Sequence, residues 1–138
     1  MDFIIDKVTE HLNKSICKYA KEKNLDNPND VQILFYLKPD GFAAVKMCVH
    51  YKATEEVTFK RAMAVKLDIA NMAGMAEYFV QQALFDFCKS DDISNENVSV
   101  MIVRKNDEDM DMHLYNSLVH VRKIDPVEIF DQTKIKTA

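Results

Sequence analysis

The longest run of hydrophobic residues at helical spacing lies between Asn71 and Lys89. Apolar side chains recur there every three or four residues, which is typical of an amphipathic helix facing a core. At about 100° per residue, the far side of this stripe carries Tyr78, Gln81 and Phe85. We therefore predict a core helix whose opposite side also carries aromatic residues and must pack against another surface. These three residues are a candidate interface, either with another part of the chain or with a second copy.

A second amphipathic helix is predicted over residues 2–24, with Leu12 and Ile16 on its apolar face. Five residues form a basic stripe on the opposite arc: Lys7, His11, Lys14, Lys18 and Lys21. Such a stripe is typical of a solvated outer face. The alternative is that these residues contact an anion, the phosphates of a nucleic acid or an acidic partner.

Alternating and β-branched patterns predict five strands, at residues 31–38, 42–52, 57–67, 98–105 and 113–124. The first is apolar on both faces, which favours a central position in the sheet. The turn residues 39–41 join it to the second strand as a hairpin. Residues 54–56 are predicted to be a polar break before the third strand. The acidic segment 106–112 joins the last two strands as another hairpin.

The expected order is α-β-β-β-α-β-β, with a short helix at 127–132 and a frayed tail at 133–138. The simplest packing for this order is an α+β fold. We predict one domain spanning residues 1–138, with a mostly antiparallel five-stranded sheet and the two longer helices packed on it.

The composition narrows the classes of function. The chain has 138 residues, 48% hydrophobic and 29% charged, which is ordinary for a globular domain. A net charge of −4 disfavours a surface that is basic throughout. The chain has no long apolar run and no basic leader, so we expect a cytoplasmic protein that does not enter a membrane. Its two glycines exclude a glycine-rich phosphate loop, and we expect no cofactor.

Two sets of residues suggest metal chemistry. The acidic segment from Asp107 to Asp111 has the Asp-x-Asp-x-Asp spacing of a calcium loop. However, that loop needs Gly at its sixth position and Glu at its twelfth, where this chain has Met112 and Leu118. A solvated hairpin tip is favoured over a looser cation site. His113 and His120 fall on opposite faces of one predicted strand, so no metal site is expected from them.

Cys48 and His50 are the only pair that resembles a nucleophile and its base. They lie two residues apart on a predicted strand and would share its wetter face with Lys46. Neither a group that orients the base nor an oxyanion site is identifiable in the sequence. We therefore predict no catalytic residues. The three cysteines are far apart and are expected to be reduced thiols.

The order of the first five elements, α-β-β-β-α, is also that of double-stranded RNA-binding domains. Those domains place lysines at the start of their second helix, whereas residues 68–72 of this chain include none. The basic stripe is then the sole support for binding nucleic acid. The sequence favours a non-enzymatic protein-protein interaction module, as a homodimer or a subunit of an assembly. The alternatives are a nucleic-acid-binding protein and, less favoured, a small enzyme with a thiol and histidine site.

Overall fold

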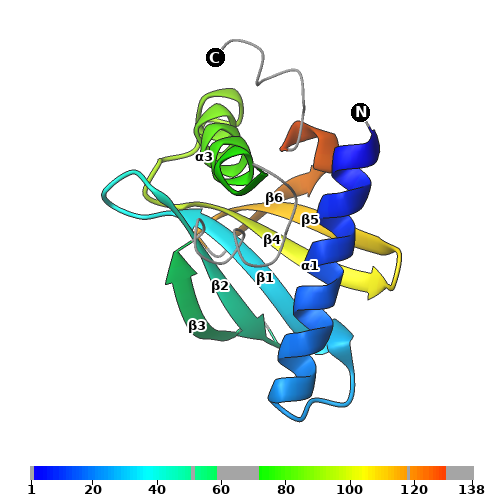
Figure 1. Cartoon of the computed structure of the whole chain (residues 1–138). Helices are drawn as coiled ribbons and strands as arrows, with labels where there is room; N and C mark the ends of the chain where they lie inside the picture. The colour runs from blue at the N-terminus through cyan, green and yellow to red at the C-terminus, as the bar shows by residue number, and fades with distance from the viewer. Residues whose placement is uncertain (1, 51, 59–71, 118, 130–138) are drawn as a thin grey trace.

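The structure is a computed structural model that describes residues 2–50, 52–58, 72–117 and 119–129 (Figure 1). Side chains are described for residues 9, 10, 12–50, 80–117 and 119–129. The described residues form two long helices, α1 (Asp2–Glu22) and α3 (Met72–Ser90). Single turns of 3-10 helix lie before the first strand and after the last: η1 (Pro28–Asp30) and η2 (Pro126–Glu128). The strands are β1 (Val31–Leu37), β2 (Ala43–Val49), β3 (Lys52–Thr58), β4 (Val98–Asn106), β5 (Asp109–Asn116) and β6 (Val119–Ile124).

The strands form one sheet in the order β3-β2-β1-β4-β5-β6, and every neighbouring pair is antiparallel. This confirms the predicted α+β class, the antiparallel sheet with two long helices, and the central place of β1. The sheet has six strands rather than five, because the segment predicted as one strand over 113–124 is a hairpin of β5 and β6. The two strands are joined by a turn in which Ser117 has a φ of 59°. Glycine is the residue that usually marks a positive φ in a sequence, so a serine at this position does not indicate the turn clearly.

The predicted limits of the third strand were wrong. Residues 54–56 lie inside β3, where Glu55 and Glu56 pair with Met47 and Lys46 of β2. The chain reverses at His50, whose φ is 50°, so β3 begins five residues earlier than predicted. Pairing with β2 outweighs the low strand propensity of glutamate, and charged residues are common on edge strands. The rest of the predicted strand, 59–67, and the predicted tail, 133–138, lie outside the described residues.

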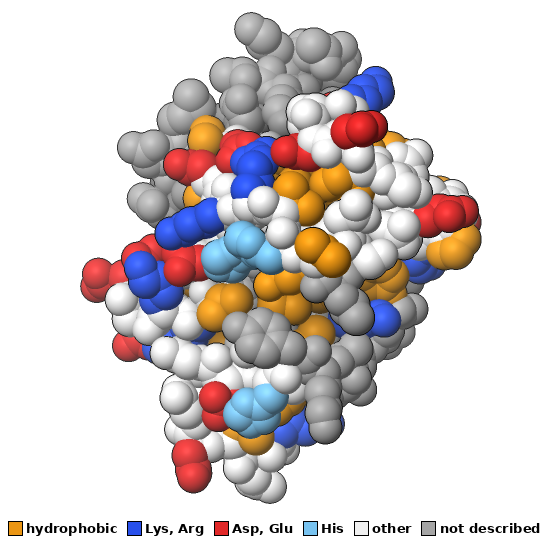
Figure 2. Space-filling view, turned by 180° about the vertical axis from the view of Figure 1, so that it is seen from behind, with side chains coloured by type: hydrophobic (Ala, Val, Ile, Leu, Met, Phe, Trp, Pro, Cys, Tyr) orange, Lys and Arg blue, Asp and Glu red, His pale blue; other side chains and the backbone are white. Residues whose placement is uncertain are grey.

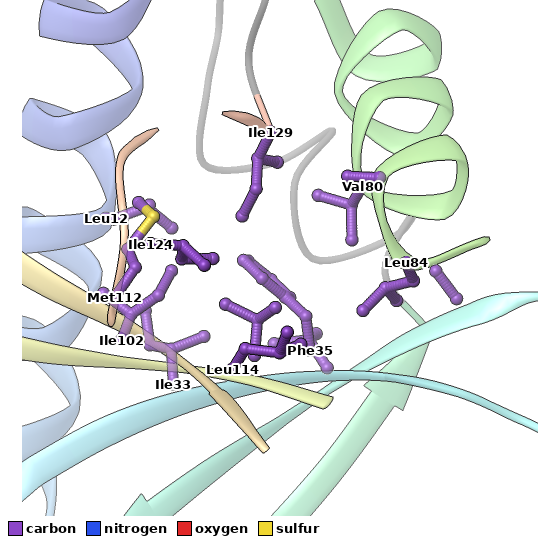
Figure 3. Packing of buried hydrophobic residues seen from close by; sticks show 14 of the residues in the cluster. Leu12, Ile33, Phe35, Val80, Leu84, Ile102, Met112, Leu114, Ile124 and Ile129 are labelled. Carbon is purple, nitrogen blue, oxygen red and sulfur yellow. The ribbon is translucent and has the colours of Figure 1, made fainter. Parts of the chain in front are cut away.

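The hydrophobic core lies between the sheet and the helices, which cover the same face of the sheet (Figure 1). Alternate residues of the four central strands β2, β1, β4 and β5 point into it, as the period-two rule requires. The predicted apolar faces of both helices are confirmed for residues 12, 16 and 19 of α1 and 80, 83, 84 and 87 of α3. Figure 3 shows side chains from both layers meeting there, among them Leu12, Phe35, Leu84 and Leu114.

Candidate functional site on the face of the sheet opposite α1 and α3

The second face of the sheet, opposite the two helices, has an apolar centre. Leu34, Tyr36, Met101 and Val103 alternate with core residues of β1 and β4 and therefore point to this face. Met101 is buried by its neighbours, and the other three are half-buried. Figure 2, which views the molecule from behind, shows hydrophobic side chains gathered here with histidine beside them. We call this surface the open face.

Charged and polar side chains surround the apolar centre. In one cross-strand row, Leu34 lies between Lys46 and Met101, and Met101 is followed by His113 and Lys123. The Nζ atom of Lys46 lies 5.1 Å from the centroid of the Tyr36 ring, so the lysine also covers part of the aromatic surface. A hydrophobic centre with a polar rim is the usual anatomy of a protein interface.

A histidine pair lies at the rim on β5 and β6. The Nδ1 atom of His113 is 3.0 Å from the Nε2 atom of His120, and the ring of Tyr115 meets that of His120 edge-on at 5.4 Å between centroids. The prediction that these histidines lie on opposite faces was wrong. They belong to two neighbouring strands and share the open face.

A β-bulge in β6 brings His120 to this face. In the second half of β6, Leu114 pairs with Arg122. If the same register held for the whole strand, His120 would lie opposite Asn116 and point to the helix side of the sheet. Instead, the register shifts by one residue between Leu114 and Tyr115, so that Val121 has no partner on β5. His120 then lies opposite Tyr115. One extra residue in a strand reverses the faces of the residues beyond it, which is how bulges re-aim side chains.

The surroundings of the pair favour the neutral form of His113. Burial of the imidazole lowers the pKa of His113, and the neighbouring His120 and Lys123 lower it further, whereas Asp111 acts in the opposite direction. Asp111 is itself paired with Lys123, at 3.0 Å between Oδ1 and Nζ. A neutral imidazole keeps one ring nitrogen with a free lone pair, which suits it to accept a hydrogen bond or to bind a metal.

Cys48 and His50 are not brought together as a nucleophile and a base. Cys48 is only 1% exposed, and burial raises the pKa of its thiol, which is the reverse of what a nucleophilic cysteine needs. His50 lies in the turn after β2, with its side chain 64% exposed and its Nδ1 atom 3.8 Å from Oδ1 of Asp30. The two residues therefore occupy different environments.

The basic stripe of α1 is described in part. Lys14, Lys18 and Lys21 are all exposed, as expected for an arc opposite the buried face. Lys14 pairs with Glu10 at 3.5 Å, which reduces the positive charge available there. The side chains of Lys7 and His11 lie outside the described residues.

The structure describes part of the predicted interface on the far side of α3. Phe85 is half-buried and packs against the core cluster. It also lines a cleft of 260 Å³, together with Leu37 and Pro39 at the β1-β2 turn. Gln81 is half-buried, and the side chain of Tyr78 lies outside the described residues.

The aspartates of the acidic hairpin form ion pairs with arginine and lysine side chains of the same chain. Asp107 pairs with Arg104, and Asp109 pairs with Lys105 at 3.5 Å. Asp111 pairs with Lys123, as described above. Within the described part of the chain, no cluster of three or more His, Cys, Asp or Glu residues could hold a metal ion. The hairpin is better explained by these ion pairs than by a cation site.

Arg122 fixes β6, and with it the position of His120, to the helical layer. Its guanidinium contacts Asp91 after α3 and Glu128 in η2, each at 3.0 Å, and lies 5.5 Å from the centroid of Phe87. Hydrogen bonds from Arg122 lower the pKa of Asp91. Burial raises the pKa of Glu128, but hydrogen bonds from Arg122 and the Asp125 backbone outweigh it, so the net shift is downward.

We expect Arg122→Met to lower the free energy of unfolding at pH 7 by about 1 to 2 kcal/mol, because a partly exposed network of charged hydrogen bonds is lost. The two carboxyl pKa values are depressed in the folded state, so the stabilisation is present above about pH 4 and lost as the pH falls. Urea unfolding at pH 7, 4 and 2.5 should show that the free energy of unfolding falls less between pH 7 and pH 2.5 in the variant than in wild type. Lys89→Met, at an exposed position of α3, is the control; an equal acid loss in Arg122→Met would contradict this account.

Comparison of the chain with protein families, with curated proteins and with solved structures found no match. In the described residues, no helix is both long enough and apolar enough to cross a membrane. The apolar centre of the open face was not among the predicted sites. The sequence did contain a signal for it, because the first strand is apolar on both faces, whereas α1 and α3 lie on the same face of the sheet.

Proposed function

We propose that this chain is a cytoplasmic protein-protein interaction module that forms a homodimer through the open face of its sheet. The observation that supports the proposal most directly is the apolar centre on β1 and β4, surrounded by polar residues on β2, β5 and β6. The solvated face of an antiparallel sheet ordinarily carries polar residues. Three free thiols at Cys17, Cys48 and Cys88 agree with a reducing compartment.

The open face has features that suit a second copy of the same surface. Its rim carries both signs of charge close together, in the Lys123 and Asp111 pair and the Lys105 and Asp109 pair. Two copies related by a twofold axis can therefore place lysine against aspartate while their apolar centres meet. A rim of a single sign would repel its own copy. The charge pattern thus favours self-association over binding to a strongly charged partner.

The test is the mass of the protein in solution. We expect wild type to be a dimer by light scattering and Leu34→Lys/Val103→Lys to be a folded monomer, because two lysines would be buried without partners in the centre of the interface. A buried unpaired charge weakens association by several kcal/mol, so the dissociation constant should rise at least about 100-fold. Circular dichroism checks that the variant is folded.

Two control variants separate this surface from others. Val127→Lys changes an apolar side chain that is 38% exposed in η2, after the end of β6, and it should leave the dimer intact. Gln81→Lys tests the far side of α3, and a monomer from this variant alone would place the interface there instead. A monomeric wild type would refute the homodimer. If that monomer bound duplex nucleic acid with an affinity that falls steeply with salt, the exposed lysines of α1 would be favoured as the functional surface.

A further inference from the structure

The spacing of the histidine pair on the open face matches that of two ligands of one metal ion. Histidine nitrogens bind divalent transition metals at about 2.0–2.1 Å. Nδ1 of His113 and Nε2 of His120 are 3.0 Å apart. Two ligands at that bond length and that separation subtend about 91 to 97° at the ion. This is the angle between neighbouring positions of a square-planar or octahedral ion, the geometries of Cu²⁺ and Ni²⁺.

We propose that His113 and His120 form a binding site for a divalent transition-metal ion of the Ni²⁺ or Cu²⁺ class, with solvent in the remaining positions. The bulge at Val121 is a second observation that supports a site, because regular pairing would have placed His120 on the helix side. The edge-on contact with Tyr115 fixes the orientation of the His120 ring. The proposal concerns ligand binding alone and does not depend on the homodimer.

The hydrogen bond between the two rings is compatible with the proposal. In the free pair, one of the two facing nitrogens carries a proton and donates it to the other. To bind an ion, both must offer lone pairs, so the donating imidazole changes to its other tautomer and its proton moves to the outer ring nitrogen. Asp111 and Lys123 beside the pair neutralise each other, so the nearby charge does not strongly repel the ion.

The experiment is calorimetric titration of the whole chain with NiCl₂ at pH 7.5 in a buffer that does not bind metal. We expect one ion per chain in wild type, with an affinity at least about tenfold weaker in His113→Gln and in His120→Gln, since either change leaves a single ligand. His50→Gln and His11→Gln are the matched controls and should bind as wild type does. Circular dichroism checks the fold of each variant.

Nitrogen-15 NMR of the histidine rings supplies the second readout. Octahedral Ni²⁺ is paramagnetic, so the ion should broaden or strongly shift the ring nitrogen signals of His113 and His120 and leave those of the other histidines in place. Wild type that binds no ion, binding lost in His50→Gln or His11→Gln instead, or a shift confined to one ring would overturn the proposal. The mass of the protein is not a readout here, so the outcome is independent of the dimer test.

Discussion

Phe35→Ala should lower the free energy of unfolding by about 3–5 kcal/mol, the range for truncating a fully buried phenylalanine. Phe35 is completely buried in the middle of β1, and its side chain lies between the sheet and the helices (Figure 3). Its backbone neighbours are Val45 on one side and Val100 on the other, both also buried. Strands held on both sides cannot move inward to fill the space, so most of the cavity should remain.

Urea unfolding followed by circular dichroism measures this effect, and the thermal midpoint should fall by roughly 10 °C or more in a domain of this size. Phe42→Ala is the matched control, because it makes the same chemical change at a residue that is 56% exposed in the β1-β2 turn. That variant should stay within about 0.5 kcal/mol of wild type. Equal losses in the two variants would mean that Phe35 does not lie in the core.

The main features of the fold followed from the periodicity of the sequence. The segments 71–89 and 31–38 each contain many apolar residues at a single period, helical in the first and that of a buried strand in the second. The limits of both elements were predicted within one or two residues. The failures occurred where long-range pairing decides the structure. Glu55 and Glu56 do not favour a strand by themselves, and only their pairing with β2 places them in one.

The histidine pair could not be predicted because its geometry depends on a turn and a bulge. The turn at Ser117 and the unpaired Val121 have no composition signal, and each changes which residues share a face. A period-two count over 113–124 assumes one regular strand and therefore separates His113 from His120. The expectation that Cys48 and His50 share one strand face failed for a related reason, because β2 ends at Val49, before it reaches His50.

A partly buried polar cluster ties α1 to the β4-β5 hairpin. The Nε atom of Arg104 donates to Oδ1 of Asn13 at 2.6 Å, and its guanidinium also contacts Asn29 and Asp107. Asn13, which is 5% exposed, donates through Nδ2 to the backbone oxygens of Asn106 and Asp107 at 2.9 and 3.0 Å. The side chain of Arg104 is only 11% exposed. Each partner therefore depends on the other for hydrogen bonds that water would otherwise make.

Asn13→Ala should lower the free energy of unfolding by about 2–4 kcal/mol, because it leaves a largely buried guanidinium short of an acceptor and two backbone oxygens short of a donor. Arg104→Met should have an effect of similar size, since the oxygens of Asn13 and Asn29 then lose their donor. The loss of unfolding free energy in the double variant should be smaller than the sum of the two single losses by about 1–3 kcal/mol. In the double variant the buried guanidinium is gone, so the missing Asn13 acceptor no longer costs stability.

Urea unfolding of all four proteins measures this coupling. Lys105→Met is the control on the same strand; its side chain is 48% exposed and pairs with Asp109 at the surface, so the change should cost less than about 1 kcal/mol. Strictly additive losses would show that Asn13 and Arg104 stabilise the fold separately. Coupling would instead show that the first helix holds the acidic hairpin in place.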